Sequence, residues 1–266
     1  MVDSIVTWRY LRAGKGRDEA RDGHGMSGDA YAVSAPVYDL SVASFRPGQV
    51  AALERLLPLV RTGSGPVLDL GAGSGLNTVF VLERLPDAQV YALEPSPAMR
   101  ALALAKIAAR PEWFNRVTIR PESFGAAPLP EAIGGAVLLG VLGHFSPDER
   151  AALFAALAAQ LPEGGAAVMD LQPPARPERV EPYEVAIAQI GELTYRGVAE
   201  GWPIDGERMR WRMTYRTLDG ERVLTEESAE HVFRHPDPEV ILAEVRAAGL
   251  SLSQIGETTF YLIVKD

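Results

Sequence analysis

Three glycines at every second position, Gly71, Gly73 and Gly75, constrain this chain more than any other stretch of its sequence. The apolar run at residues 67–70 precedes them and is typical of a short buried strand. An apolar stretch without turn residues begins at Thr78 and favours a helix. Glycine adopts positive φ without strain and lets a ligand approach the backbone. The pattern predicts strand, turn and helix, with the first N–H groups of the helix aimed at a ligand in the turn.

The spacing of these glycines separates several kinds of nucleotide-binding turn. In the dinucleotide fingerprint G-x-G-x-x-G, the third glycine would fall where the chain has Leu76 or Thr78. The phosphate-binding loop ending in G-K-[ST] is excluded too, because the turn contains no lysine. The motif D-x-G-x-G-x-G, which begins at Asp69, instead resembles the first motif of class I S-adenosylmethionine-dependent methyltransferases. A purely structural turn of an α/β protein is the alternative.

This resemblance implies a cofactor. In the family, the turn binds the methionine end of S-adenosylmethionine, a zwitterion that needs backbone N–H groups on one side and an acid near its ammonium. The residues that the resemblance assigns to this end of the cofactor are Asp69, Gly71, Ala72 and Gly73.

A second strand is expected over residues 88–94, and it ends in an acid, Glu94. Ser96 and Pro97 then open a helix, with serine as the N-cap and proline at the first helical position. A carboxylate at this strand tip can accept hydrogen bonds from both hydroxyls of an adenosine ribose, each worth about 1.5–3 kcal/mol. Several nucleotide-binding α/β folds place an acid here, so Glu94 indicates a ligand that contains a ribose but does not distinguish one such cofactor from another. We also expect Pro95 to border this site; a solvated strand-end glutamate is the alternative.

Composition narrows the class of protein. The chain has 266 residues, 47% of them hydrophobic, which suits one large α/β domain with a full core. A net charge of −9 argues against a nucleic-acid groove. With no cysteine and four histidines, no metal site is expected. No apolar run approaches the ~20 residues that cross a bilayer, and no signal peptide is evident, so a cytoplasmic enzyme is expected.

The N-terminal part divides into two segments. Residues 1–29 predict a flexible leader ahead of one domain over residues 30–266, and translation could start at Met1 or Met26. The segment that contains Tyr31 and Tyr38 resembles the tyrosine-rich Y-D segment of many small-molecule methyltransferases, which folds over the cofactor as a lid. An arm whose aromatic residues anchor it to the core is the alternative.

The remaining strands predict an α/β fold with a doubly wound, mostly parallel sheet. Strands are expected over residues 117–122, 135–140 and 166–171, each separated by helical or loop segments. The last two, 250–255 and 258–264, are joined by two residues, which is too short for a parallel crossover. A seven-stranded sheet closed by one reversed last strand is the methyltransferase topology.

The ends of the third and fourth strands carry further residues that the resemblance assigns to the cofactor. Glu122 and Ser123 leave the third strand where the family has an acid that contacts the adenine amino group, commonly Asp. The carbonyl groups of Leu139 and Gly140 would receive the cofactor's ammonium.

Residues 172–234 depart from the strand–helix rhythm and predict an insertion. We expect a helix around residues 185–195 and then a β-hairpin that turns at Gly220. Apolar side chains alternate with polar ones along the first strand of this hairpin. We expect this apolar face to roof the pocket; packing on the main sheet or a subunit contact is the alternative. The residues of this face are Met209, Trp211, Met213 and Tyr215.

Methyl transfer from a sulfonium depends mainly on alignment in a water-poor cleft, which can contribute ~7–11 kcal/mol. A general base adds typically 10²–10⁴-fold where the nucleophile must lose a proton. His144 follows the fourth strand and is the candidate base, with Tyr38 as a second catalytic candidate; a histidine that only hydrogen-bonds the backbone is the alternative. By the resemblance, Tyr31, Tyr38 and His144 line the acceptor pocket, together with Trp211 of the roof.

Two absences narrow the acceptor. The N-P-P-Y motif of nucleobase and glutamine-amide methylases is missing, and so is a basic groove. The layout is similar to small-molecule N-methyltransferases of amino sugars and antibiotic precursors. We therefore expect S-adenosylmethionine-dependent methylation of an amine or hydroxyl of a small molecule, in secondary metabolism, with a homodimer as one option. The alternatives are a non-catalytic S-adenosylmethionine-binding regulator, an O-methyltransferase of a lipid or quinone-like acceptor, and a nicotinamide-dependent oxidoreductase.

Overall fold

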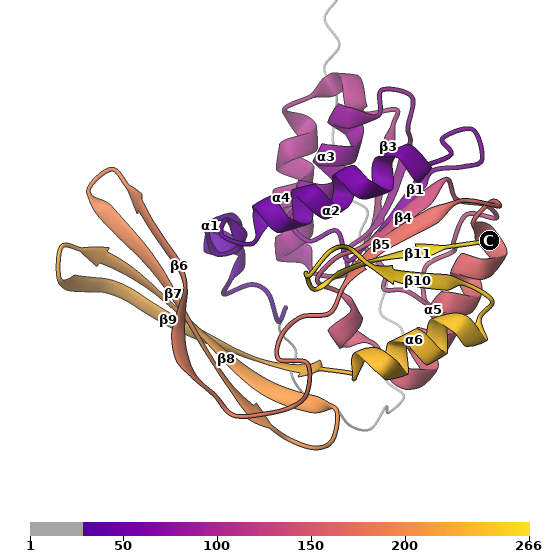
Figure 1. Ribbon diagram of the computed structural model, residues 1–266. Helices are drawn as coiled ribbons and strands as arrows, with labels where there is room; N and C mark the ends of the chain where they lie inside the picture. Colours follow the sequence, from indigo (N-terminus) through magenta and orange to yellow (C-terminus); the bar gives the residue numbers. More distant parts are fainter. Residues whose placement is uncertain (1–28) are drawn as a thin grey trace, which may run out of the picture.

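The computed structural model describes residues 29–266, so the predicted leader lies outside the described residues except for Asp29. Its core is a seven-stranded sheet in the order β10-β11-β5-β4-β1-β2-β3 (Figure 1). The last strand, β11, runs antiparallel to both of its neighbours, while the pairs among β1 to β5 are parallel. The predicted topology is confirmed. The strands are β1 (Val67–Leu70), β2 (Val90–Leu93), β3 (Val117–Arg120), β4 (Gly135–Leu138), β5 (Ala166–Asp170), β10 (Ser251–Gln254) and β11 (Phe260–Val264).

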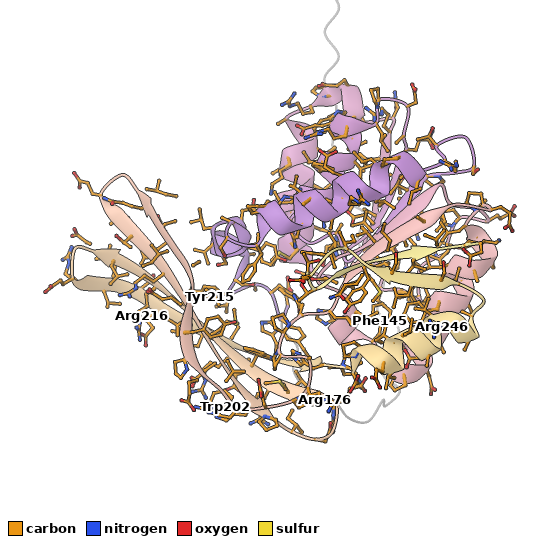
Figure 2. The ribbon with its side chains drawn as sticks, in the orientation of Figure 1. Phe145, Arg176, Trp202, Tyr215, Arg216 and Arg246 are labelled. Atoms are coloured by element: carbon orange, nitrogen blue, oxygen red, sulfur yellow. The ribbon has the colours of Figure 1, made fainter. Side chains whose placement is uncertain are left out.

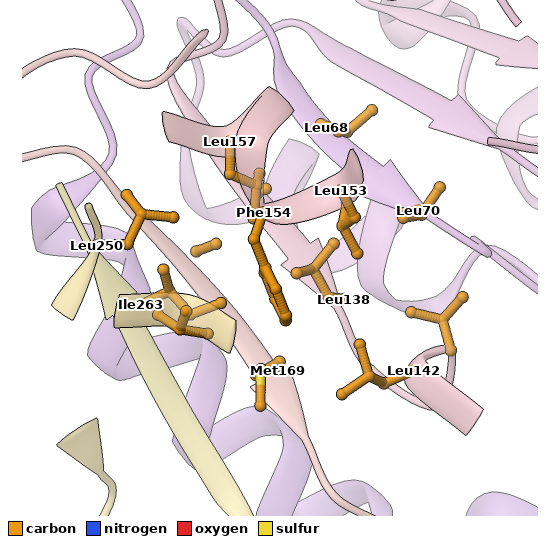
Figure 3. Close-up of a cluster of buried hydrophobic side chains, with 14 of the residues drawn as sticks. Leu68, Leu70, Leu138, Leu142, Leu153, Phe154, Leu157, Met169, Leu250 and Ile263 are labelled. Atoms are coloured by element: carbon orange, nitrogen blue, oxygen red, sulfur yellow. The ribbon is translucent and has the colours of Figure 1, made fainter. Parts of the chain in front are cut away.

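Helices cover both faces of this sheet, and each face has its own apolar core. Because successive strand residues point to opposite faces, Leu68 and Leu138 pack toward one core and Val67 and Val137 toward the other. Figure 3 shows the first core, in which the fully buried Phe154 lies among leucines. The helices are α1 (Tyr38–Val42), α2 (Arg46–Leu56), α3 (Leu76–Arg84), α4 (Pro97–Ala108), α5 (Pro147–Gln160) and α6 (Pro238–Ala247), with 3-10 turns at Ala35–Val37, Leu57–Leu59, Pro111–Trp113 and Leu142–His144.

Side chains cap the starts of three helices, and the first of them confirms the predicted start at Ser96. Ser96 accepts a hydrogen bond from the Met99 N–H at the start of α4. Ser146 and Glu149 form a complete capping box at the start of α5. Asp237 caps α6. In each case proline follows the cap, where its missing N–H costs no helical hydrogen bond.

The insertion is a four-stranded antiparallel sheet, so the helix predicted around residues 185–195 is wrong. Residues 185–188 are apolar at consecutive positions, a run that periodicity alone cannot assign to helix or strand. Gly191, at φ 60°, is instead the first residue of a two-residue hairpin turn, and the backbone groups of this segment form hydrogen bonds with the next strand. The strands are β6 (Val180–Ile190), β7 (Leu193–Pro203), β8 (Arg208–Asp219) and β9 (Arg222–Arg234), and the predicted turn at Gly220 is confirmed.

The two faces of this inserted sheet differ in chemistry. Arg212 pairs with Glu230 at 2.9 Å, and Arg216 pairs with Glu226 at 2.5 Å, on the solvent face. The neighbouring Tyr215 is 9% exposed and lies on the opposite face (Figure 2). The apolar face therefore turns toward the core domain, as the alternation in β8 predicted.

Arg150 connects the inserted sheet to the core. Its side chain is 1% exposed and donates to Glu244 of α6 at 2.8 Å and to Glu207 of the β7–β8 loop at 2.5 Å. A buried guanidinium needs such partners, because an unpaired buried charge is strongly destabilising. The pairing holds one end of the inserted sheet against α5 and α6. Within residues 29–266, no helix has both the length and the apolar character to cross a bilayer.

Candidate active site

The glycine turn after β1 has the geometry that its sequence predicted. Gly71, Gly73 and Gly75 have φ of 67°, 57° and 85°, in the region that side chains other than glycine rarely adopt. A Cβ at Gly71 would also lie 2.9 Å from the Val141 side chain, and one at Gly75 would lie 2.9 Å from Ala103. Glycine is thus required both for the backbone turn and for close packing.

Glu94 lies beside this turn, at the same end of the sheet. One carboxylate oxygen accepts from the Gly73 N–H at 2.6 Å and the other from the Ser96 N–H at 2.8 Å. Burial raises the pKa of this carboxyl. A carboxylate offers about four acceptor positions, so two remain for donors such as ribose hydroxyls.

A cavity of about 290 Å³ opens next to the turn. Its walls come from the glycine turn, the segment after β4, the N-terminal arm of residues 29–45, and the apolar face of the inserted sheet. Eight of the predicted site residues line it: Tyr31, Tyr38, Gly71, Ala72, Gly73, Leu139, Gly140 and Trp211.

Two further predicted residues are not part of the cavity lining but contact residues that are. Glu94 binds the Gly73 N–H, and His144 lies 2.9 Å from the Tyr31 hydroxyl. The roles assigned to these residues stay predictions.

The structure does not bring the other predicted residues to the cavity. Asp69 is 1% exposed and accepts from the Thr78 hydroxyl at 2.5 Å, so its carboxylate ties β1 to α3 beneath the turn. Burial raises the pKa of Asp69 to about 6. Glu122 pairs with Arg120, Ser123 is exposed beside it, and Pro95 is also exposed. The adenine contact assigned to Glu122 would compete with this ion pair.

The N-terminal arm crosses the glycine turn. Asp29 accepts from the Ser96 hydroxyl at 2.9 Å and the Ala98 N–H at 2.8 Å, at the start of α4. Asp39 accepts from Ser74 at 2.5 Å and pairs with Lys106 at 2.8 Å. The arm therefore covers the turn, the position that the resemblance assigned to a lid.

Tyr38 of this arm lines the cavity close to Gly73. Burial and the nearby Glu94 raise the pKa of Tyr38 to about 12, so its phenol keeps its proton. A protonated phenol donates hydrogen bonds but does not accept a proton, so Tyr38 is suited to hold a ligand rather than to act as a base.

His144 belongs to an aromatic cluster with three residues that line the cavity, Tyr31, His231 and Phe233. Its ring meets Phe233 edge-on at 5.0 Å, and His231 stacks on Phe233 at 5.4 Å and lies 5.1 Å from Tyr31. Although part of His144 reaches the surface, desolvation of the imidazole and the nearby His231 lower its pKa. The ring is therefore neutral at pH 7, and its lowered pKa makes it a weaker base than an ordinary histidine.

Asp170 is a site residue that the sequence reasoning missed. It ends β5, is 8% exposed, lines the cavity and accepts from the Gly140 N–H at 2.6 Å. Burial raises the pKa of Asp170 to about 6. The signal that singled out Glu94, an acid at the carboxyl end of a buried strand, was present here as well.

The donors and charges of the site fit S-adenosylmethionine. Within the described residues, the cavity lining contains no lysine or arginine and one carboxylate, Asp170, with Glu94 directly behind it. A pyrophosphate would find no counter-charge in such a site, whereas a sulfonium and an ammonium would. Gly73 has no side chain to fill the space between the turn and Tyr38.

Comparison with known proteins agrees with this site. A family model described as a methyltransferase domain matches residues 67–165, which include the glycine turn and Glu94. A malonyl-[acyl-carrier protein] O-methyltransferase of Halorhodospira halophila is 27% identical over 228 residues, 85% of this chain and 72% of that protein.

Solved structures share the fold. DesVI of Streptomyces venezuelae has a TM-score of 0.70 at 20% identity, over 88% of this chain and 98% of its own. The sugar N-methyltransferase KedS8 of a Streptoalloteichus species has a TM-score of 0.63 at 21% identity, over 95% and 99%.

CalS10 of Micromonospora echinaspora is an amino pentose methyltransferase solved with S-adenosylmethionine bound. It has a TM-score of 0.66 at 18% identity, over 92% of this chain and all of its own. With its glycine turn, Glu94 and matching family model, the chain carries a methyltransferase domain and is an S-adenosylmethionine-dependent methyltransferase.

Proposed function

We propose that this enzyme methylates an amine of a small organic molecule of the amino-sugar or antibiotic-precursor type. The observation that carries this proposal is the charge of the cavity lining, in which Asp170 is the single charged side chain among the described lining residues. A carboxylate can hold a cationic amine by a charge-assisted hydrogen bond. A malonyl group, named for the O-methyltransferase relative, ends in a carboxylate and would meet Asp170 without a cation to offset it.

Aromatic side chains add to this preference. Tyr31, Trp211 and Tyr215 line the same cavity as Asp170. Aromatic faces attract ammonium groups by about 0.5–2 kcal/mol, more as water is excluded. Among the solved relatives, one is described as a sugar N-methyltransferase, one as a glycopeptide N-methyltransferase and one as an amino pentose methyltransferase, which supports an amine acceptor of this class.

The residues of this chain can then be given roles. S-adenosylmethionine supplies an electrophilic methyl group when bound. Asp170 orients the acceptor amine, and the arm with Tyr31 and Tyr38 excludes water. The amine must lose its proton to become a nucleophile, and neutral His144, which touches both Tyr31 and the surface, is placed to pass that proton to solvent.

A panel of acceptors tests the proposal. The protein is incubated with S-adenosylmethionine and, separately, with amino sugars, aromatic amines, phenols and a malonyl thioester, and methylated products are measured by mass spectrometry. We expect N-methylated amines and no malonyl methyl ester. Ester formation alone would overturn the amine assignment. Binding of S-adenosylhomocysteine without product from any acceptor would support the non-catalytic alternative.

A hydroxyl acceptor is a second candidate, favoured by the 2.9 Å contact between Tyr31 and neutral His144. A hydroxyl must lose its proton during attack, so a base matters more for it than for an amine. We expect His144→Ala to slow methylation of a phenol about tenfold while leaving S-adenosylhomocysteine affinity within about twofold. An unchanged rate would leave His144 with a structural role. A homodimer, the lack of nucleic-acid partners and a cytoplasmic location stay predictions.

A further inference from the structure

His235 lies directly beyond β9 and is 5% exposed. Its Nε2 is 3.0 Å from the indole Nε1 of Trp211, and its Nδ1 is 3.0 Å from the Pro174 carbonyl and 3.2 Å from the Gln172 carbonyl. An indole N–H only donates and a carbonyl only accepts. The ring must therefore be neutral, with its proton on Nδ1 and its free lone pair on Nε2 facing Trp211.

These partners come from two different segments that border the cavity. Trp211 belongs to β8 of the inserted sheet and lines the cavity. Gln172 and Pro174 follow β5 and its terminal acid, Asp170. The His235 ring is thus the hydrogen-bonded link between the aromatic roof and the strand end that carries the acid.

The backbone of His235 is held independently of its ring. Its N–H donates to the Glu207 carbonyl at 2.7 Å, and the Glu207 side chain pairs with buried Arg150 of α5. This second attachment keeps the chain after β9 in place when the imidazole is changed. A substitution of the ring therefore acts on its three partners and on the part of the cavity wall that His235 itself forms.

We propose that His235 is a positioning residue that sets acceptor affinity by fixing the indole of Trp211 over the acceptor space. The inference rests on the proposed function in one respect, that Trp211 contacts the acceptor. None of the hydrogen bonds of His235 reaches the glycine turn or Glu94, so its substitution should leave the cofactor site unchanged. Because His235 also lines the cavity, a Trp211→Phe background is needed to separate a direct contact with the acceptor from an effect through the indole. With alanine at 235, the indole N–H loses its acceptor and Trp211 is free to reorient.

The first test needs no acceptor. Indole N–H signals are followed by ¹⁵N nuclear magnetic resonance in the full-length protein, and Trp211→Phe identifies the Trp211 signal. We expect the Trp211 indole proton to exchange with water at least about tenfold faster in His235→Ala than in the wild type, as loss of a hydrogen bond allows. His235→Gln should retain slow exchange, because glutamine can accept from the indole and donate to a carbonyl. Equal exchange in wild type and His235→Ala would overturn the link.

The second test separates acceptor from cofactor. With the amine that the wild type methylates fastest, we expect His235→Ala to raise the acceptor KM about tenfold and to leave kcat and S-adenosylhomocysteine affinity within about twofold. His235→Gln should recover most of the KM. In a Trp211→Phe background, His235→Ala should have no further effect, because the two residues act as one unit. Trp202→Phe, on the solvent face of the same sheet, is the matched control and should leave KM unchanged.

The outcomes distinguish this inference from the proposed function. If no acceptor is methylated, the proposed function is wrong, but the indole exchange rates still show whether His235 holds the indole of Trp211. If amines are methylated and His235→Ala leaves KM unchanged, or if its KM effect persists in the Trp211→Phe background, the positioning role is wrong.

Discussion

Glu94→Ala is expected to weaken binding of S-adenosylhomocysteine at least about a hundredfold. Two charge-assisted hydrogen bonds to ribose hydroxyls contribute about 1.5–3 kcal/mol each, and about 1.4 kcal/mol corresponds to a factor of ten in affinity. The structure adds a second loss, because Glu94 also accepts the Gly73 N–H at 2.6 Å and thereby holds the glycine turn. Isothermal titration calorimetry with S-adenosylhomocysteine measures the change directly.

Two further variants make this measurement specific. Glu112→Ala removes an exposed acid after α4 and should leave the affinity unchanged. Glu94→Gln keeps the shape of the side chain but presents an NH₂ group to one of two backbone donors, so we expect most of the loss to remain. Wild-type affinity in Glu94→Ala would contradict the assignment of Glu94 to the ribose.

Asp170→Asn is expected to lower kcat/KM for an amine acceptor by about 10- to 100-fold, because a hydrogen bond to a charged group contributes about 1.5–3 kcal/mol. Asparagine can still accept the Gly140 N–H that Asp170 binds at 2.6 Å, so the turn after β4 should keep its shape. Steady-state kinetics with one amine and one neutral phenol provide the comparison. The phenol should lose much less than the amine; equal losses would show that Asp170 shapes the site without recognising charge.

The pH dependence of the same variant follows from burial. Because the pKa of Asp170 is raised to about 6, the wild type should lose kcat/KM for the amine as pH falls below about 6 and the carboxylate is protonated. Asp170→Asn has no group to titrate, so the ratio of wild-type to variant kcat/KM should shrink toward low pH. A ratio that stays constant from pH 5 to pH 8 would contradict this role.

The Asp170→Asn substitution should affect thermal stability in the opposite direction from activity. The pKa of Asp170 is higher in the folded state than in the unfolded state, so the ionised carboxylate destabilises the fold. This destabilisation begins as the pH rises above the unfolded-state pKa and is complete once the pH exceeds the folded-state pKa. Asp170→Asn removes this destabilisation, so its Tm at pH 7 should equal or exceed that of the wild type, and the difference should disappear near pH 4. A less active but more stable variant is typical of a residue retained for function.

Local sequence rules were sufficient for the glycine turn and the acid beside it, although the structure does not bring Asp69, Pro95, Glu122 and Ser123 to the cavity. Gly71 and Gly75 are required by their own backbone angles, and the caps at Ser96 and Ser146 involve residues within one helical turn. Such interactions are short-range, so their residue types and spacing predict them. The reversed β11 followed in the same way, because the short link to β10 excludes a crossover.

The acceptor half was predicted less well. Residues 185–190 form a strand where a helix was expected, because pairing with β7 decides between two structures that a short apolar run allows equally. Asp170 was missed, although it ends a buried strand as Glu94 does, because no family motif pointed to it. The contact between Trp211 and His235 joins residues 24 positions apart across two strands.

The sheet, its glycine turn and the acid beside it could thus be predicted from the sequence alone, since each depends on backbone conformation or on chain length between neighbours. Which side chains meet over the acceptor space became known from the folded structure. The N-terminal arm, the turn after β4 and the inserted sheet come together there through contacts of Tyr31 with His144, 113 residues away, and with His231 of β9. Contacts of that kind depend on how separate elements pack, and packing is not encoded in the spacing of any one segment.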